Sequence, residues 1–114
     1  MNRKILERKA EFYNKQEGRK FPCSNQIVSC GVITDDRNKA LAIMNEKGAT
    51  IKSQSIYNRI EWMLDNERWI WRNWNESVKA FRFYKVIVDE NIDESVFHHI
   101  EPLLANYCCS FEII

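Results

Sequence analysis

The segment from Glu67 to Val88, ERWIWRNWNESVKAFRFYKVIV, limits the possible folds more than any other part of the chain. Three of the four tryptophans and three further aromatic residues fall in this stretch. Apolar and polar side chains alternate on both sides of Asn75–Ser77, which predicts a β-hairpin with its turn at these residues. The second arm ends in the apolar run Val86–Val88, which is typical of a strand whose end becomes central in a sheet.

The residues before this segment predict three helices and a strand. Helical spacing of apolar residues predicts a helix over residues 3–18, and β-rich composition predicts a strand over 26–34. A second helix is expected over 36–48, with Thr34 or Asp35 as its cap and Gly48 as its left-handed end. A third is expected over 56–66, because Ile56, Ile60, Met63 and Leu64 share one helical face.

The C-terminal residues predict a fourth helix and a last strand. Asn91 can cap a helix that begins at residue 92 and that Pro102 should kink. The run CCSFEII at residues 108–114 has the composition of a short strand. The expected order is therefore α-β-α-α-β-β-α-β in a single domain, 1–114. This order predicts an α+β fold, with a small antiparallel sheet and helices mainly on one face.

Two architectures fit this order. If the third helix is an insertion, the remainder is the split βαβ arrangement of ferredoxin-like folds. Alternatively, KALAIMNEKGATIKSQSIYNRIEWML followed by RWIWRNWNESVKAFRFYKV resembles a winged helix-turn-helix over residues 1–88. That resemblance implies a DNA-binding regulator, although the long GATIKSQS connection and the two C-terminal elements depart from the winged-helix pattern.

Composition indicates a globular protein of one domain. The chain has 114 residues, of which 45% are hydrophobic and 29% charged, with a net charge of +1. Residues 1–20, the predicted basic N-terminal helix, hold seven Lys or Arg against three Glu, and such an arm can reach phosphate or an acidic partner. The sequence has no apolar segment near the ~20 residues of a membrane span, so we expect no membrane association and a cytoplasmic protein.

Cysteine and histidine give weak signals for a metal or a catalytic site. Cys23, Cys30, Cys108 and Cys109 lack the spacing of zinc ligands, so reduced and mostly buried thiols without a cofactor are expected. The adjacent His98 and His99 diverge on a helix, although His98 could form an acid-base couple with Glu94 or Glu101. We expect one histidine at the surface and one at the edge of the core. Acidic residues at Asp35 and Asp89 are interpreted as helix-start carboxylates.

The aromatic and basic residues of the central segment are the candidate binding residues. Aromatic residues interleaved with arginine are typical of base-stacking platforms and also of protein interfaces. If the segment is a regular strand, Trp69 and Trp71 share one face and Trp74 lies on the other. At least one of the four tryptophans is expected to be exposed beside Arg68 or Arg72. The predicted site consists of Arg59, Trp62, Arg68, Trp69, Trp71, Arg72, Trp74, Lys79 and Arg82.

The absence of an assembled catalytic motif favours a small non-enzymatic binding protein. A composition rich in Asn, Ile and Lys and poor in Ala, Gly and Pro suggests a phage origin. The expected partner is a host protein of nucleic-acid metabolism or defence, such as a polymerase or a defence nuclease, which the chain would inhibit or regulate. Direct binding of DNA or RNA by a winged-helix-like regulator is the alternative, and a small nuclease using His98 or His99 is the third. Direct DNA binding would require the five cationic site residues to share a surface with the N-terminal arm.

Overall fold

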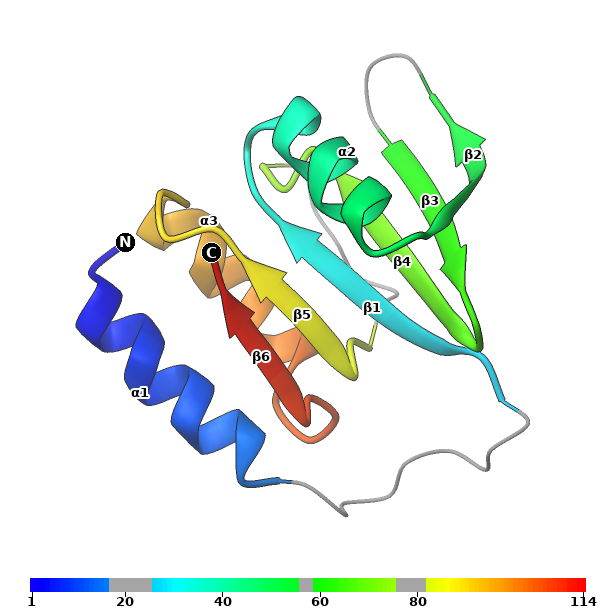
Figure 1. The fold of residues 1–114 in the computed structure, drawn as a ribbon. Helices are drawn as coiled ribbons and strands as arrows, with labels where there is room; N and C mark the ends of the chain where they lie inside the picture. The colour runs from blue at the N-terminus through cyan, green and yellow to red at the C-terminus, as the bar shows by residue number, and fades with distance from the viewer. Residues whose placement is uncertain (17–25, 56–58, 76–81) are drawn as a thin grey trace.

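The computed structural model describes residues 1–16, 26–55, 59–75 and 82–114. It contains a six-stranded sheet in the order β2-β3-β4-β1-β5-β6. Figure 1 shows this sheet running through the molecule, with helices on both of its faces. The strands are β1 (Val28–Ile33), β2 (Thr50–Gln54), β3 (Arg59–Leu64), β4 (Glu67–Arg72), β5 (Lys85–Val88) and β6 (Ser110–Ile113).

The sheet is mixed. β1 pairs in parallel with β4 on one side and with β5 on the other, and β5 pairs in parallel with β6. β2, β3 and β4 form an antiparallel meander. The carboxyl ends of β1, β4, β5 and β6 therefore lie side by side at one end of the strands.

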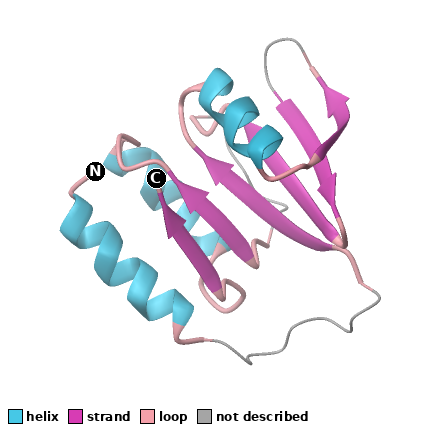
Figure 2. Cartoon of the chain, in the orientation of Figure 1, coloured by secondary structure: helices cyan, strands magenta, loops and turns pink. Residues whose placement is uncertain are grey.

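Three helices and one 3₁₀ turn accompany the sheet. The helices are α1 (Arg3–Asn14), α2 (Arg37–Glu46) and α3 (Glu94–Ile100), and η1 (Glu101–Leu103) continues from α3. α2 and α3 lie on opposite faces of the sheet, while α1 runs beside β6 (Figure 2). Within the described ranges, no helix is long and apolar enough to cross a membrane.

α1 covers the β6 edge of the sheet. The Asn14 carboxamide donates to the carbonyl of Phe111 at 3.2 Å and accepts from its N–H at 2.8 Å. The Tyr13 ring stacks on the Phe111 ring, with centroids 5.7 Å apart. A side-chain amide thus replaces the neighbouring strand that an edge residue lacks.

The helix ends follow local sequence rules. Asp36 caps α2 by accepting from the N–H of Lys39, and Asp93 caps α3 by accepting from Ser95. The predicted caps lie slightly earlier: Thr34 or Asp35 was expected for α2, and Asn91 for α3. Gly48 has φ +78°, which confirms the predicted left-handed end of α2. Pro102 lies in η1, so the predicted break in the last helix is also confirmed.

The predicted third helix is wrong for residues 59–64, which form β3, while residues 56–58 lie outside the described part of the chain. Ile60 and Trp62 are buried and alternate with the more exposed Arg59 and Glu61. This two-residue period fits a strand. The β3–β4 turn, where Asp65 has φ 54°, then fixes the antiparallel register.

The predicted hairpin is also wrong, because β4 and β5 do not pair with each other. Both pair with β1, which lies between them. The apolar run Val86–Val88 correctly marks a central strand, but its neighbours are β1 and β6. Of the predicted turn residues, Asn75 is described and the other two are not.

The α+β class and the rough order of elements are confirmed. The sheet is mixed rather than antiparallel, and its helices lie on both faces. These features differ from both proposed architectures, since a ferredoxin-like sheet is antiparallel and a winged helix needs the helix predicted over residues 56–66. The sheet has two more strands than predicted, because residues 50–54 form β2 and residues 59–64 form β3 in place of the predicted helix.

Candidate binding site

All four tryptophans are buried, with exposed fractions between 1% and 5%. The expectation of an exposed tryptophan is therefore wrong. In the β3–β4 register, Trp62 opposes Trp69 and Ile60 opposes Trp71, so these four side chains share one face of the sheet. Trp62 lines a hollow together with Leu41 and Asn45 of α2, so this is the face toward α2. Trp74 packs edge-on against Phe83, with ring centroids 5.9 Å apart. Phe83 lies against the other face, where it approaches Gly31.

Two tryptophans attach the end of β4 to β1. The indole N–H of Trp71 donates to the carbonyl of Thr34, and that of Trp74 donates to the carbonyl of Val32, each at 2.8 Å. An indole has a single polar hydrogen, so each ring has its donor satisfied inside the protein. These residues therefore serve the core and hold the carboxyl ends of two parallel strands together.

Three of the predicted arginines occupy one surface. Arg59 opposes Arg72 in the β3–β4 register, and Arg68 opposes Met63, on the face opposite the tryptophans of β3 and β4. The Glu61 carboxylate lies 3.1 Å from Arg59 Nη2 and 3.6 Å from Arg68 Nε. We call Arg59, Glu61, Arg68 and Arg72 the arginine face.

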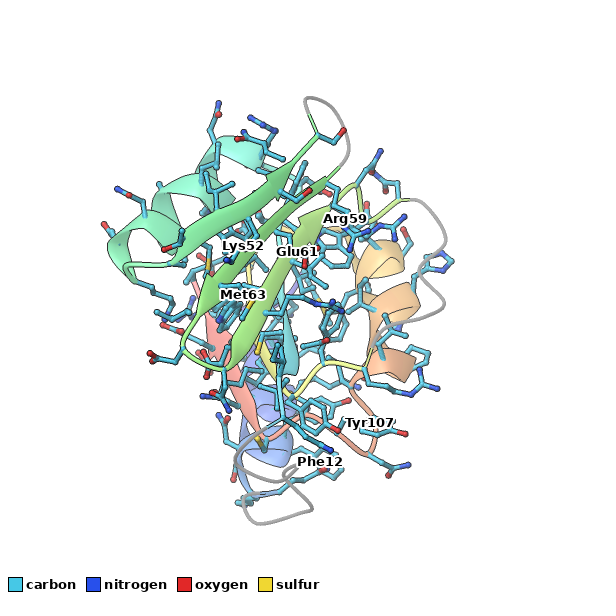
Figure 3. The ribbon with its side chains drawn as sticks, turned by 90° about the vertical axis from the view of Figure 1, so that its right-hand side faces the viewer. Phe12, Lys52, Arg59, Glu61, Met63 and Tyr107 are labelled. Carbon is cyan, nitrogen blue, oxygen red and sulfur yellow. The ribbon has the colours of Figure 1, made fainter. Side chains whose placement is uncertain are left out.

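The arginine face continues to the outer strand of the sheet. Figure 3 shows Lys52 of β2 beside Glu61 and Met63 of β3, with Arg59 close by. The side chains of Arg59 and Arg68 are 44% and 39% exposed. The surface is therefore cationic and partly open to solvent, with one carboxylate among its basic groups.

The other basic site residues lie elsewhere or outside the described chain. The Arg82 guanidinium lies over the Tyr107 ring, 5.4 Å from its centroid, and Tyr107 is far from Arg59 in Figure 3. Lys79 is not among the described residues. Arg59 and Arg82 therefore do not form one surface with the N-terminal arm, which direct DNA binding was expected to require.

The basic N-terminal helix lies at the opposite edge of the sheet from β2 and β3. Several of its cations have acidic partners within the fold. Arg3 contacts Glu7 and Glu90, Lys9 contacts Glu101, and Lys15 contacts Glu11. The hydrogen bond to Glu90 raises the pKa of the Arg3 guanidinium. These ion pairs reduce the charge that the helix presents to an anionic partner.

A crevice of about 240 Å³ lies at the carboxyl ends of β1 and β4. Its lining residues are Thr34, Asp35, Trp71, Arg72, Asn73, Trp74 and Asn75. No prediction from the sequence included this crevice, although polar residues directly follow the apolar strands β1 and β4. In open sheets with parallel strands, ligands bind outside the carboxyl ends, where neighbouring strands connect in opposite directions. In this sheet that position lies between β1, after which the chain continues toward β4, and β5, after which it continues toward β6, so it is next to the crevice rather than at it.

A polar network around the buried Asp89 carboxylate supports the carboxyl ends of these strands. The Thr34 hydroxyl donates to the Asp89 carboxylate at 2.8 Å, and the Lys39 ammonium lies 3.1 Å from that carboxylate. Burial would raise the pKa of Asp89, but hydrogen bonds from the Asn91 N–H, Thr34 and Lys39 outweigh it and hold the pKa below its ordinary value. Asp89 therefore remains charged and links β5 to β1 and α2.

Asp35 has a different environment from Asp89. Partial desolvation, followed by the negative charges of Asp89 and Asp93, raises the pKa of the Asp35 carboxyl above its ordinary value. The side chain is solvent-exposed at the mouth of the crevice. Asp35 therefore has two other carboxylates near it, while the guanidinium of Arg72 lines the same crevice.

No disulfide joins the cysteines of the described residues. Cys30 and Cys108 are buried and Cys109 is partly buried, while Cys23 lies outside the described residues. Burial raises the pKa of the Cys108 thiol to about 12 and raises that of Cys30 further. Across the described ranges, no group of three or more His, Cys, Asp or Glu residues is arranged to hold a metal ion.

Both histidines are exposed on α3, so the expected position of one at the core edge is wrong. His98 Nε2 lies 3.7 Å from Glu94, and His98 Nδ1 lies 3.6 Å from Glu101. These distances agree with the spacing predicted from the sequence.

Comparison with known proteins finds no matching family model, curated protein or solved structure.

Proposed function

We propose that this chain is a non-enzymatic binding protein that attaches to an acidic surface of a partner protein through the arginine face. The observation that carries the proposal is the position of Arg59, Arg68 and Arg72 on one side of the β3–β4 pair. Their guanidinium groups can form paired hydrogen bonds with carboxylates, which gives both affinity and a defined orientation.

The composition of the face favours a protein partner over a nucleic acid. Arginine is enriched in protein interfaces, and mixed charge is typical of their polar rims. Glu61 lies between Arg59 and Arg68, where it would repel a phosphate backbone but can hold both arginines in place. The four buried tryptophans do not supply the exposed rings on which single-stranded bases stack.

The partner class predicted from the sequence remains part of the proposal. A host protein of nucleic-acid metabolism or defence would supply the acidic surface, and the chain would inhibit or regulate that protein. Direct attachment to DNA or RNA is the competing outcome, since arginines also contact phosphates. The two outcomes differ in their response to nuclease and in the probes that bind.

The test uses the full chain, immobilised and incubated with a bacterial lysate with and without nuclease. The binding variant carries Arg59→Gln and Arg68→Gln, which remove two charges at partly exposed positions. The matched control carries Arg8→Gln, an exposed arginine of α1 at the other edge of the sheet. A gel-shift assay with duplex and single-stranded DNA at low and high salt tests the competing outcome.

The proposal predicts a captured protein that survives nuclease treatment, elutes with salt, is lost with the double variant and is retained with the control. Rim charges act mainly through association rate, so raised salt should weaken capture. Release of the partner by nuclease, together with a salt-sensitive gel shift, would instead establish nucleic-acid binding. Equal capture by the double variant and the wild type would contradict the assignment of the arginine face.

A further inference from the structure

We propose that the outer edge of β2, with the apolar hollow beside it, binds an extended acidic segment of the partner protein as an additional β-strand. The inference rests on the proposed function, because it names the part of the partner that would lie next to the arginine face. It adds a contact on the α2 side of the sheet that the arginine face alone does not require.

β2 forms one edge of the sheet. Among the described strands it pairs only with β3, and all five of its residues are exposed. The β6 edge is different, because the Asn14 side chain of α1 satisfies the Phe111 backbone there. An edge strand presents backbone N–H and C=O groups on its outer side, and a further strand can pair with them.

A hollow of about 360 Å³ lies between β2 and α2. Apart from Asn45, its lining residues are apolar: Leu41, Ala42, Ala49, Ile51 and Trp62. Trp62 is buried, so the other apolar residues supply the open surface, and Ile51 is 46% exposed. Ile51 belongs to β2, so a side chain on this face of an added strand would lie beside it. A leucine or isoleucine of the partner segment could enter the hollow and cover the exposed Ile51.

The other face of an added strand would meet basic groups. Successive side chains of a strand point to opposite faces of the sheet, so the neighbours of the apolar residue would point toward the arginine face. In Figure 3, Lys52 lies there beside Glu61 and Met63. Lys52, Arg59 and Arg68 outnumber the Glu61 carboxylate, which contacts both arginines. Aspartate or glutamate at alternate positions of the segment should therefore be favoured, since opposite charges on neighbouring strands attract.

Lys52 also argues against a second copy of this chain as the added strand. It lies at the irregularity of β2 between Ile51 and Ser53 and has no counterpart in the β2–β3 register. A bulge and a lysine on an edge strand both hinder pairing between copies, because two β2 strands would bring like charges into one short ribbon. The same lysine attracts an acidic segment. Because the bulge shortens the regular pairing, the apolar and acidic side chains should supply most of the affinity.

The test is a calorimetric titration of the full chain with synthetic peptides at neutral pH. In the first peptide leucine and glutamate alternate. Each of the others changes one property: lysine replaces glutamate, serine replaces leucine, or the backbone amides are N-methylated. We expect saturable binding of the first peptide and at least tenfold weaker binding of the others, which lose the charge, the apolar anchor or the strand hydrogen bonds. Hydrogen exchange of the β2 amides should slow when the first peptide is bound.

The binding variants change the two faces of β2 separately. Ile51→Ser removes the apolar wall and should weaken binding of the leucine–glutamate peptide at least tenfold. Lys52→Glu reverses the charge and should weaken it at least fivefold. The matched controls are Ile27→Ser and Lys4→Glu, which make the same changes at exposed positions outside β2. Both controls should keep wild-type affinity.

Three results would overturn the inference: no saturable binding of the leucine–glutamate peptide, equal binding of its N-methylated form, or unchanged affinity in Ile51→Ser. The proposed function fails separately, when the Arg59 and Arg68 double variant captures the partner as well as the wild type does. A partner whose capture depends on these two arginines but is unchanged in Ile51→Ser would keep the proposed function and exclude strand addition.

Discussion

The hydroxyl of Thr34 and the carboxylate of Asp89 form a 2.8 Å hydrogen bond between residues 55 positions apart in the sequence. Thr34 follows β1 and Asp89 follows β5, so the bond joins the ends of two neighbouring parallel strands. Lys39 of α2 completes the network through its ion pair with Asp89. The network thus connects β1, β5 and α2 at the end of the sheet where the crevice lies.

Asp89→Ala should destabilise the fold strongly. The change leaves the buried Thr34 hydroxyl without its acceptor, which costs about 1–3 kcal/mol. It also leaves Lys39, whose side chain is 36% exposed, without its counter-charge. Chemical denaturation followed by tryptophan fluorescence measures the loss. Glu90→Ala is the matched control, because Glu90 makes an exposed pair with Arg3 and its loss should cost much less. Equal losses in the two variants would contradict the role of the network.

The lowered pKa of Asp89 also predicts a pH dependence. The ordinary value is 3.8, and the folded value lies below it. Charged Asp89 therefore stabilises the fold above about pH 4, and this contribution disappears as the pH falls from about 4 toward the lowered folded value. In Asp89→Asn, the free energy of unfolding should decline less over that range than in the wild type. Parallel denaturation curves at several acidic pH values check this, and identical slopes would contradict it.

Local features were predictable from the sequence, because short-range rules determine them. Gly48 follows an apolar helical stripe and ends α2 in the left-handed conformation, as expected. Alternation placed Trp69 and Trp71 on one strand face, and the β3–β4 register agrees. β3 was predicted incorrectly because Ile60 and Leu64 satisfy a helical period as well as a strand period.

The crevice depends on contacts that no local rule gives. Thr34 meets Trp71 only because β1 enters the sheet between β4 and β5. The sequence predicted that β4 and β5 pair directly, since consecutive strands often do. For the same reason a tryptophan of the predicted hairpin was expected to be exposed. In the fold, Trp62, Trp69 and Trp71 are buried on one face of the sheet, and Trp62 lies against α2.

Gly31→Ala should destabilise the centre of the sheet. An added Cβ would lie 3.2 Å from Ile33 Cδ1 and 3.3 Å from two atoms of the Phe83 ring. Both neighbours are fully buried and have little space to move, so overpacking should cost about 1–2 kcal/mol. Thermal denaturation measures the loss, and a variant as stable as the wild type would show that the Phe83 ring can shift.

Gly48→Ala tests a different mechanism at the end of α2. No atom lies within 4 Å of the added Cβ, but the φ of +78° is unfavourable for alanine. The expected cost is about 1–2 kcal/mol, from backbone strain alone. Gly48→Asn should recover part of it, because asparagine enters the left-handed region more readily. If alanine and asparagine have the same stability, backbone strain is not the cause.

The thiols should differ in their reactivity. Burial holds Cys30 and Cys108 in the protonated form, with pKa values far above neutral, and the thiolate is the reactive species. Native protein treated with iodoacetamide at about pH 8 should therefore resist alkylation at both residues, while the partly exposed Cys109 reacts. Peptide mapping by mass spectrometry identifies the sites. Denatured protein is the control and should be alkylated at all three.

Asn14→Ala should loosen α1 from the β6 edge. The substitution removes both hydrogen bonds to the Phe111 backbone, which otherwise satisfy its N–H and carbonyl. Because the site is only partly buried, water can replace part of the loss, and we expect a cost of about 1 kcal/mol. Asn14→Asp keeps the acceptor for the Phe111 N–H but loses the donor, so its stability should be intermediate.

Asn38→Ala, at an exposed position of α2, is the control for removing a helical asparagine and should cost little. Hydrogen exchange at Phe111 provides the local measurement: its amide should exchange faster in Asn14→Ala than in either Asn14→Asp or the control, and unchanged protection would mean that α1 holds the edge without this contact.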